Sequence, residues 1–267
     1  METGQPSRTA YSAARYRAAH QVIDGGAIFA DPLAVRIVGE PPDTDEVPGR
    51  RGQRLFIAAR ARFAEDALAA AFERGTRQAV VLGAGLDTFA YRNPYPGLEV
   101  VEVDHPDTQA WKRRRLHDAR IEVPATLTYV PVDFEKESLR DRLAARAGAF
   151  FVWLGVVPYL SRTGFDETLA FVAGTDRAEV VFDYAMPTAS MSSERRTALE
   201  ARAARAARVG EPWRSSFQPE EIAGLLNEHG FGEVEDLGPA ELAERYFGRP
   251  GVPKDTPGGH VLRARKI

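Results

Sequence analysis

The chain has 267 residues, of which 44% are hydrophobic and 27% are charged, and its formal net charge is −3. These values are ordinary for a globular domain, and without an excess of basic residues we expect no nucleic-acid partner. The sequence has no cysteine, which excludes a disulfide framework, a thiolate metal site and a cysteine nucleophile. Since no apolar run reaches transmembrane length and no secretory signal is recognisable, we expect a cytoplasmic protein without a membrane partner.

Helices are expected at the start of the chain. Residues 8–38 show helical spacing, and Asp31 followed by Pro32 is typical of a helix start. Residues 52–74 predict a long helix that ends at Gly75. We expect residues 1–75 to form a helical cap, and residues 76–267 to form a second, larger domain.

Strand-like and helix-like segments alternate from residue 76 onward. The expected strands are 78–83, 98–104, 127–131, 149–154 and 178–184, and the expected helices are 87–92, 107–119, 136–147 and 162–173. A helical insert follows at 188–217, then a helix that ends near Gly230, a weak strand at Val234 and a last strand at 259–267. Alternation of this kind indicates an α/β fold with a doubly wound, mostly parallel sheet and helices on both faces.

A glycine turn follows the first of these strands. Residues Gly83, Ala84 and Gly85 end the apolar run 78–82, and we expect a helix to begin just after them. Glycines let a ligand approach the backbone, and a helix start offers free N–H groups. Thr88 stands where a dinucleotide fingerprint has its third glycine, and Asp87 would repel a pyrophosphate. The turn therefore favours a ligand with a cationic end, such as S-adenosylmethionine (SAM), although an ordinary strand–turn–helix corner remains an alternative.

An acid ends the second strand of the alternating region. Asp104 follows Gly83 at roughly the 20-residue spacing at which acids accept hydrogen bonds from ribose hydroxyls. Glu102 points to the same side of the strand, but only the residue at the carboxyl end can reach a ligand in the crevice. Pro106 stops the strand here, so we choose Asp104, with a plain surface acid as the alternative.

The carboxyl ends of the strands are expected to line one crevice, because ligands of open α/β sheets bind there. These ends carry Gly83–Gly85, Asp104, Asp133 and Leu154. Asp133 is able to accept a hydrogen bond from an adenine amino group, and the Phe134 backbone N–H is able to donate to a ring nitrogen. A helix N-cap is the alternative for Asp133. The spacing of histidines and acids suggests no metal site.

These motifs identify a family. The segments LGAGLDTFAYR and VEVDHPDTQAWKRR strongly resemble the leucine carboxyl methyltransferase family, which includes actinobacterial proteins regarded as SAM-dependent methyltransferases and polyketide carboxyl O-methyltransferases. Further resemblances run in order from about residue 8 to about residue 185, including residues 9–18, 29–34, 59–63, 131–134 and 153–160. The resemblance implies a seven-stranded class I SAM methyltransferase fold, with SAM as the cofactor. It does not specify the methyl acceptor.

The resemblance also implies roles for individual residues. Arg60 resembles the family arginine that binds the cofactor's carboxylate, and Arg17 is a weaker candidate for the same role. Leu154 departs from the family, in which many members have glutamate near the methionine portion of the cofactor. The second contact to the cofactor's ammonium group is therefore in doubt, and Asp87 is a candidate for part of it. Either arginine could instead be solvated.

Methylation of a carboxylate fits the absence of a clear catalytic dyad, because a carboxylate is already ionised at pH 7 and needs no general base. We therefore expect a SAM-dependent O-methyltransferase that acts on a small-molecule carboxylate, as in secondary metabolism. The alternatives are a phenol or hydroxyl O-methyltransferase, a SAM-binding protein without turnover, and a NAD-linked oxidoreductase. Candidates for the acceptor pocket are Tyr11, His105 and Tyr159. The sequence does not predict an oligomeric state.

Overall fold

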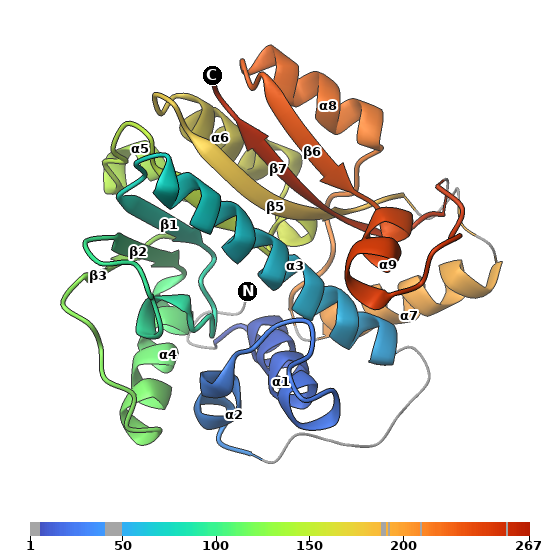
Figure 1. The fold of residues 1–267 in the computed structure, drawn as a ribbon, viewed down its shortest axis with the longest axis horizontal. Coiled ribbons are helices and arrows are strands. Elements are labelled where there is room, and N and C mark those ends of the chain that lie inside the picture. Colours follow the sequence, from blue (N-terminus) through green and yellow to red (C-terminus); the bar gives the residue numbers. More distant parts are fainter. Residues whose placement is uncertain (1–5, 41–49, 188–190, 192, 209, 255) are drawn as a thin grey trace.

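The computed structural model describes residues 6–40, 50–187, 191, 193–208, 210–254 and 256–267. A seven-stranded sheet runs through its centre in the order β3-β2-β1-β4-β5-β7-β6. The pairs from β3 to β5 are parallel, and β7 is antiparallel to both of its neighbours. The expected doubly wound, mostly parallel sheet is thereby confirmed (Figure 1).

The strands follow the apolar runs of the sequence. They are β1 Gln78–Leu82, β2 Glu99–Asp104, β3 Leu127–Pro131, β4 Phe150–Trp153, β5 Glu179–Ala185, β6 Glu233–Leu237 and β7 Gly259–Arg265. All five residues of β1 are buried, as expected for a central strand with both faces covered. Val80 and Leu82 pack into the core on one face of the sheet, and Ala79 and Val81 pack into the core on the other.

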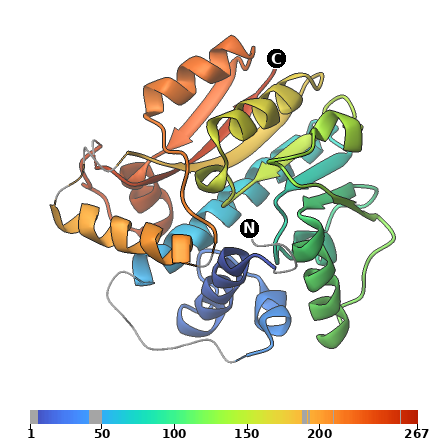
Figure 2. The same cartoon turned by 180° about the vertical axis from the view of Figure 1, so that it is seen from behind.

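Each face of the sheet is covered by its own helices. Helix α3 (Arg50–Glu73) crosses the face seen in Figure 1, and α9 (Pro239–Phe247) lies against the same core. Helices α6 (Arg162–Ala173) and α8 (Pro219–Glu228) cover the opposite face, seen in Figure 2. Phe165 and Ile222 are the apolar side chains by which these two helices enter that core, both fully buried.

A third cluster joins the N-terminal helices to α4. It contains residues of α1 (Arg8–Ile23), α2 (Pro32–Val38) and α4 (Pro106–Asp118). The expected helical region 8–38 is two helices, because Gly25 and Gly26 adopt positive φ angles of 61° and 67° between them. Asp31 then starts α2, where its side chain accepts a hydrogen bond from Ala34 N at 3.1 Å. Pro32 occupies the first turn of that helix, as the sequence predicts.

Two expected helices are much shorter than predicted. Residues 87–92 form only a 3-10 turn, η1 (Phe89–Tyr91), because Pro94 and Pro96 follow immediately and a helix interior does not accept proline. Residues 136–147 form only the short α5 (Leu139–Arg142). This helix ends at Leu143, which turns into an extended conformation and packs against the core.

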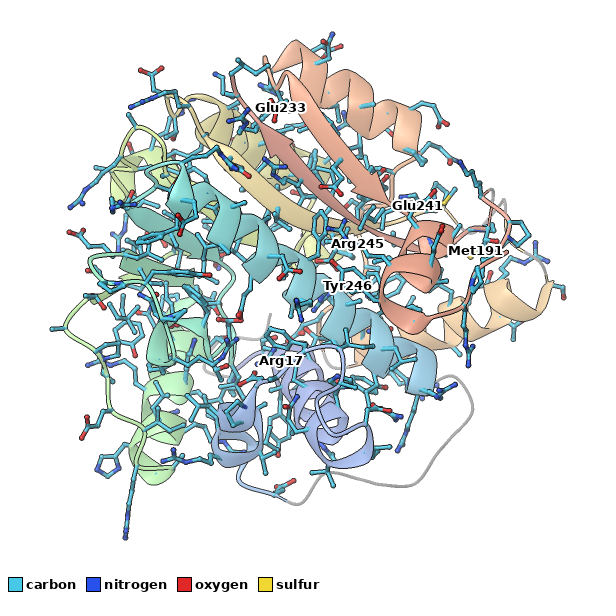
Figure 3. All side chains as sticks on the ribbon, viewed as in Figure 1. Arg17, Met191, Glu233, Glu241, Arg245 and Tyr246 are labelled. Carbon is cyan, nitrogen blue, oxygen red and sulfur yellow. The ribbon has the colours of Figure 1, made fainter. Side chains whose placement is uncertain are left out.

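The C-terminal region contains one helix that the sequence analysis missed. Helix α9 has proline in its first turn, an acid at Glu241, a base at Arg245 and a left-handed Gly248 at its end, which are ordinary start and stop signals. Arg245 lies over the Phe63 ring of α3 at 5.4 Å, so α9 is fixed to the long helix (Figure 3). The expected inserted helix is present as α7 (Ser193–Arg208). None of the helices in the described ranges is long and apolar enough to cross a membrane.

Candidate functional site

The glycine turn is held tightly against its neighbours. Gly83 N and Ala84 N both donate to Val103 O, at 2.8 and 3.1 Å, which ties the turn to β2. Gly83 and Gly85 have φ angles of +67° and +46°. A Cβ atom at Gly83 would lie 2.3 Å from Val156 Cγ2, and one at Gly85 would lie 2.9 Å from Ala10 Cβ. Both positions therefore require glycine, and the turn lies between the end of β4 and the start of α1.

Asp104 lies beside this turn at the carboxyl end of β2. Its Oδ2 accepts a hydrogen bond from Gly85 N at 2.5 Å and its Oδ1 accepts one from His105 N at 2.7 Å. Burial raises the pKa of Asp104, and these two backbone N–H groups oppose that rise. The carboxylate is thus fixed in orientation, and each oxygen keeps a lone pair for a further donor.

Glu102, the acid two residues before Asp104 in β2, lies away from the strand end. Its Oε2 is 2.7 Å from Lys112 Nζ, and both side chains are only 1% exposed. Tyr91 OH donates to the same oxygen at 3.3 Å. Burial raises the pKa of Glu102 to about 7, although Lys112 opposes this rise. Glu102 is therefore enclosed in the interior, which leaves Asp104 as the acid of β2 at the strand end.

Asp133 and His105 meet across the ends of β2 and β3. His105 Nε2 lies 3.7 Å from Asp133 Oδ2, which also accepts a hydrogen bond from Lys136 Nζ at 2.8 Å. Burial alone would raise the pKa of Asp133, but the bonds from Lys136 and from the Glu135 backbone lower it overall. Asp133 is thus kept ionised beside His105, and the neighbouring Phe134 packs against the core.

Arg60 lies on α3 and reaches the ends of β4 and β5. Its Nη1 is 2.6 Å from Asp183 Oδ2, and the two side chains are only 10% and 5% exposed. Asp183 Oδ1 accepts a hydrogen bond from Gly155 N at 2.5 Å. A Cβ atom at Gly155 would lie 2.8 Å from Arg60 Nη2, so the guanidinium lies directly against this glycine. Sequence reasoning chose Arg60 but missed Asp183, which lies within the apolar part of β5 that follows Glu179.

Leu154 and Asp87 line one small pocket between α3 and the ends of β1 and β4. Its lining also includes Glu65 and the apolar residues Ala61, Ala64, Leu68, Val81, Phe89 and Val152. Asp87 Oδ1 accepts a hydrogen bond from Phe89 N at 2.8 Å. Burial raises the pKa of Glu65, whose two oxygens are both bound by Arg92. Leu154 therefore shares this pocket with two acids, Glu65 and Asp87.

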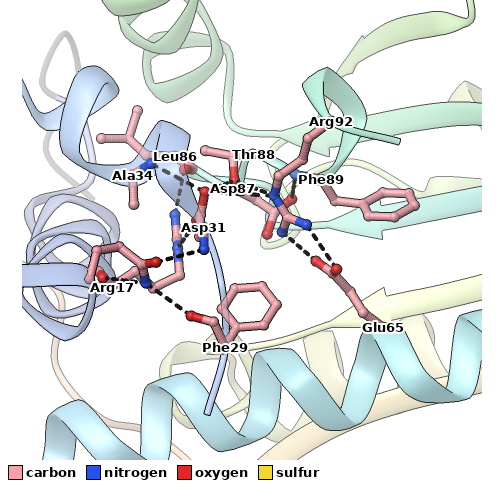
Figure 4. Close-up of polar contacts among 11 residues, drawn as sticks. Arg17, Phe29, Asp31, Ala34, Glu65, Leu86, Asp87, Thr88, Phe89 and Arg92 are labelled. Atoms are coloured by element: carbon pink, nitrogen blue, oxygen red, sulfur yellow. Dashed lines mark hydrogen bonds and ion pairs between the residues drawn. The ribbon is translucent and has the colours of Figure 1, made fainter. Parts of the chain in front are cut away.

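Arg17 belongs to a buried network between the N-terminal helices and the glycine turn (Figure 4). Its Nε donates to Asp31 Oδ2 at 3.1 Å and its Nη2 donates to Leu86 O at 2.6 Å. Asp31 also accepts a hydrogen bond from Thr88 Oγ1 at 2.6 Å, and Arg92 lies on its other side. Arg17 thus holds the backbone just after the glycine turn, instead of standing free in the crevice.

Glu211 joins the inserted segment to the start of α1. Its carboxylate accepts hydrogen bonds from Arg8 N at 2.9 Å, from Thr9 N at 3.1 Å and from the Ser7 and Thr9 hydroxyls. Three residues further on, Arg214 N donates to Pro158 O at 2.7 Å, just after β4. Residues 211–217 therefore run from the first turn of α1 to the end of β4. No local signal marks Glu211, because its partners lie about 200 positions away.

The three candidates for the acceptor pocket lie apart from one another. Tyr11 packs edge-on against Trp111 of α4, with 5.7 Å between ring centroids. Tyr159 ends the short turn η2 (Val157–Tyr159) after β4, next to the Pro158 carbonyl that the inserted segment contacts. His105 lies at the opposite side of the glycine turn, after β2. The structure brings Tyr159 near residues 211–217, and it does not bring these three side chains together.

Comparison with known proteins relates the chain to methyltransferases. The sequence profile of the leucine carboxyl methyltransferase family matches residues 10–173. A relative from Bacillus subtilis, named "Putative S-adenosyl-L-methionine-dependent methyltransferase YktD", is 36% identical over 200 residues, which are 71% of this chain and 65% of that protein. The chain thus spans slightly less than two thirds of that relative's length.

Solved structures share the fold at low sequence identity. Magnesium protoporphyrin IX methyltransferase from Synechocystis, solved with bound S-adenosylhomocysteine (SAH), has a TM-score of 0.51 at 12% identity, covering 97% of this chain and 100% of that one. The CurJ carbon methyltransferase has a TM-score of 0.55 at 16% identity, covering 98% of this chain and 68% of that one. The fold is therefore that of class I SAM methyltransferases.

Proposed function

Because the chain belongs to the leucine carboxyl methyltransferase family, we propose that it is a SAM-dependent methyltransferase whose acceptor is the carboxylate of a small molecule. One observation carries the proposal: the glycine turn, Asp104 and Asp133 lie at the carboxyl ends of adjacent parallel strands, and Arg60 reaches the same edge of the sheet from α3. The crevice at these ends is where open α/β sheets bind nucleotides and related ligands. Secondary metabolism is the setting that we propose for such an acceptor, and the cytoplasm is the proposed location.

SAM fits the chemical groups along this edge. We assign the ribose hydroxyls to Asp104, whose carboxylate is already oriented by two backbone N–H groups. We assign the adenine amino group to Asp133 and an adenine ring nitrogen to the Phe134 backbone N–H. The positive φ angles and missing Cβ atoms of the glycine turn admit a ligand close to the backbone. Asp87 and Leu154 line the small pocket on the α3 side of this turn.

Arg60 is the residue that we assign to the cofactor's carboxylate. Among the described residues its hydrogen bonding is limited to Nη1, so Nε and Nη2 keep donors that suit a carboxylate. Arg17 is no longer a good second candidate, because Asp31 and the Leu86 carbonyl already accept its hydrogen bonds. We propose instead that Arg17 positions the backbone of the glycine turn.

Bound SAM would supply a methyl group attached to a positively charged sulfur. An oxygen of the acceptor attacks the methyl carbon in line with the carbon–sulfur bond, and SAH leaves. The chain's contribution is to hold the two reactants in position and to exclude water. The first turn of α1 and residues 211–217 lie over the strand ends and are joined by Glu211. We propose that they form the cover of the crevice, and that Tyr159 borders the acceptor.

The geometry of His105 makes this residue unsuited to act as the general base for a phenol acceptor. Asp107 N donates to His105 Nδ1 at 3.2 Å, so a neutral imidazole carries its proton on Nε2, facing Asp133. An imidazole in that tautomer has no free lone pair to take a proton from a phenol. A carboxylate acceptor needs no such base, because it is ionised at neutral pH.

Methyl transfer from radiolabelled SAM to a panel of carboxylic acids and phenols tests the proposal. The labelled product should release volatile methanol in dilute alkali, because methyl esters hydrolyse there and methyl ethers do not. A label that stays in the product after alkali would show a phenol or hydroxyl acceptor instead. Calorimetry with SAH and NAD is the matching binding test. Binding of SAH without turnover on any acceptor would favour a SAM-binding protein, and binding of NAD alone would contradict the proposal.

A further inference from the structure

Asp183 is a buried acid near the carboxyl end of β5. It contacts two groups at the ends of β4 and β5, the Arg60 guanidinium at 2.6 Å and the Gly155 amide at 2.5 Å. Each of its oxygens therefore has one partner, while an ionised carboxylate has about four lone-pair directions. Arg60 likewise keeps unused donors in the described part of the chain. The pair is thus neutral overall but able to accept and donate further hydrogen bonds.

Leu154 comes just before Gly155 in the chain, and its apolar side chain cannot bind an ammonium group. Of the other acids nearby, Glu65 has both oxygens bound by Arg92. Asp87 Oδ1 is bound by the Phe89 amide, and Asp87 lies in the pocket on the α3 side of the glycine turn. Asp183 is the acid that touches both the amide following Leu154 and the arginine assigned to the cofactor's carboxylate.

An amino-acid end group matches such a pair in charge and in spacing. It carries a carboxylate and an ammonium group on one carbon atom, so that its charges alternate with those of a guanidinium and a carboxylate held side by side. Binding it leaves no net charge buried, which avoids the large cost of an unpaired ion. Gly155 makes this arrangement possible, because a side chain there would collide with the Arg60 guanidinium.

We propose that Asp183 binds the ammonium group of the cofactor's amino-acid end, while the neighbouring Arg60 binds its carboxylate. Asp183 thereby supplies a contact that the apolar side chain of Leu154 cannot make. This inference rests on the proposed function, since it takes SAM as the ligand. It assigns Asp183 a direct contact with the cofactor and predicts that the amine contributes to affinity through this residue.

Calorimetry on the full chain with two ligands tests the inference. One ligand is SAH, and the other is its deaminated analogue, in which hydrogen replaces the amino group while the carboxylate and adenosine remain. Asp183→Asn should weaken SAH about 10- to 100-fold, as expected for the loss of a charge-assisted hydrogen bond. It should change the affinity of the deaminated analogue less than about twofold, because that ligand has no group for Asp183 to bind.

Two further variants complete the design. Asp166→Asn removes an aspartate from an exposed pair with Arg162 and should leave both affinities unchanged. Asp183→Glu keeps a negative charge opposite Arg60. If Asp183→Asn does not fold, this variant tests the ammonium contact instead. The longer side chain should still lower SAH affinity about 3- to 10-fold without affecting the analogue.

The inference is overturned if the Asp183 variants weaken both ligands equally or neither. It is also overturned if the selective loss appears in Asp87→Asn and not at position 183. If the wild type binds neither SAH nor its analogue, the proposed function itself is contradicted. A wild type that binds both ligands with equal strength is a different outcome. Equal affinity for the two ligands would contradict the ammonium contact but would still support SAM as the cofactor.

Discussion

Two of the buried acid–base pairs in the described part of the chain differ in their surroundings. Glu102 and Lys112 are each 1% exposed, and Glu102 Oε1 has no hydrogen-bond partner in the described ranges. Asp183 and Arg60 are also largely buried, but they lie at the strand ends beside Gly155 and keep unused hydrogen-bonding capacity. The fully enclosed Glu102–Lys112 pair can affect only folding, whereas the Asp183–Arg60 pair at the strand ends can also bind a ligand. Four predictions test this contrast.

The largest effect on stability is expected from removing the charged partner of Glu102 in its buried pair with Lys112. Lys112→Met leaves an unpaired carboxylate in the interior and should reduce the free energy of unfolding by about 3–5 kcal/mol, measured in urea. The double variant Lys112→Met/Glu102→Gln should recover most of this loss, because it buries no charge. If the single variant were as stable as the wild type, the pair would be more hydrated than the structure indicates.

A dependence of stability on pH should come from the same pair. The pKa of Glu102 is raised to about 7 in the folded chain, so the folded state binds a proton more tightly than the unfolded state. Its contribution to stability is therefore present at low pH and is lost as pH rises towards 7, by at most about 1.4 kcal/mol per pH unit. The difference in unfolding free energy between the wild type and the double variant should fall over this range. A constant difference would contradict the raised pKa.

At the crevice, a substitution should act on the ligand more than on the fold. Asp104→Ala should weaken SAH binding by about 1–3 kcal/mol, because hydrogen bonds from ribose hydroxyls to an ionised oxygen are lost. Calorimetry measures this, and Asp118→Asn, at the exposed end of α4, is the control. Unchanged affinity in Asp104→Ala would place the ribose elsewhere along the strand ends.

The smallest effect is expected where the inserted segment meets α1. Glu211→Gln removes a negative charge from the first turn of that helix, which is worth about 0.3–1 kcal/mol, or roughly two- to fivefold in an equilibrium. Amide hydrogen exchange of residues 8–11 should become faster by that factor, while exchange in β1 stays the same. If both regions accelerate together, Glu211 stabilises the whole fold and does not act as a local contact between the two segments.

The sheet and its strand-end residues were predictable because their signals are local. Each buried strand is a short apolar run, and Asp104 and Asp133 follow such runs directly, so chain order alone places them at one edge. Glu211 and Asp183 were not predictable as site residues, since their partners in α1 and α3 come from distant parts of the sequence. Leu154 was recognised as a departure, but no spacing rule indicates Asp183 as its neighbour.

Two errors of the sequence analysis have physical causes that were visible in the residues. The helix expected after the glycine turn is prevented by Pro94 and Pro96, which follow the 3-10 turn directly. Helix α9 was overlooked although its proline start and glycine end are ordinary. Arg17 illustrates a different difficulty, because a buried arginine that binds a carbonyl and one that binds a ligand look alike in a sequence.

The 3-10 turn that replaces a helix after β1 has an electrostatic consequence. In dinucleotide-binding folds, the helix that follows the first strand directs the positive end of its dipole at the pyrophosphate. Here the chain passes from the glycine turn into η1 and then into prolines, so that no long row of aligned peptide dipoles points at the crevice. A phosphate would meet no helix dipole at this point. A sulfonium ion, as proposed here, would meet no repulsion from a helix dipole. Asp87 lies just before η1, so its carboxylate places a negative charge close to this point.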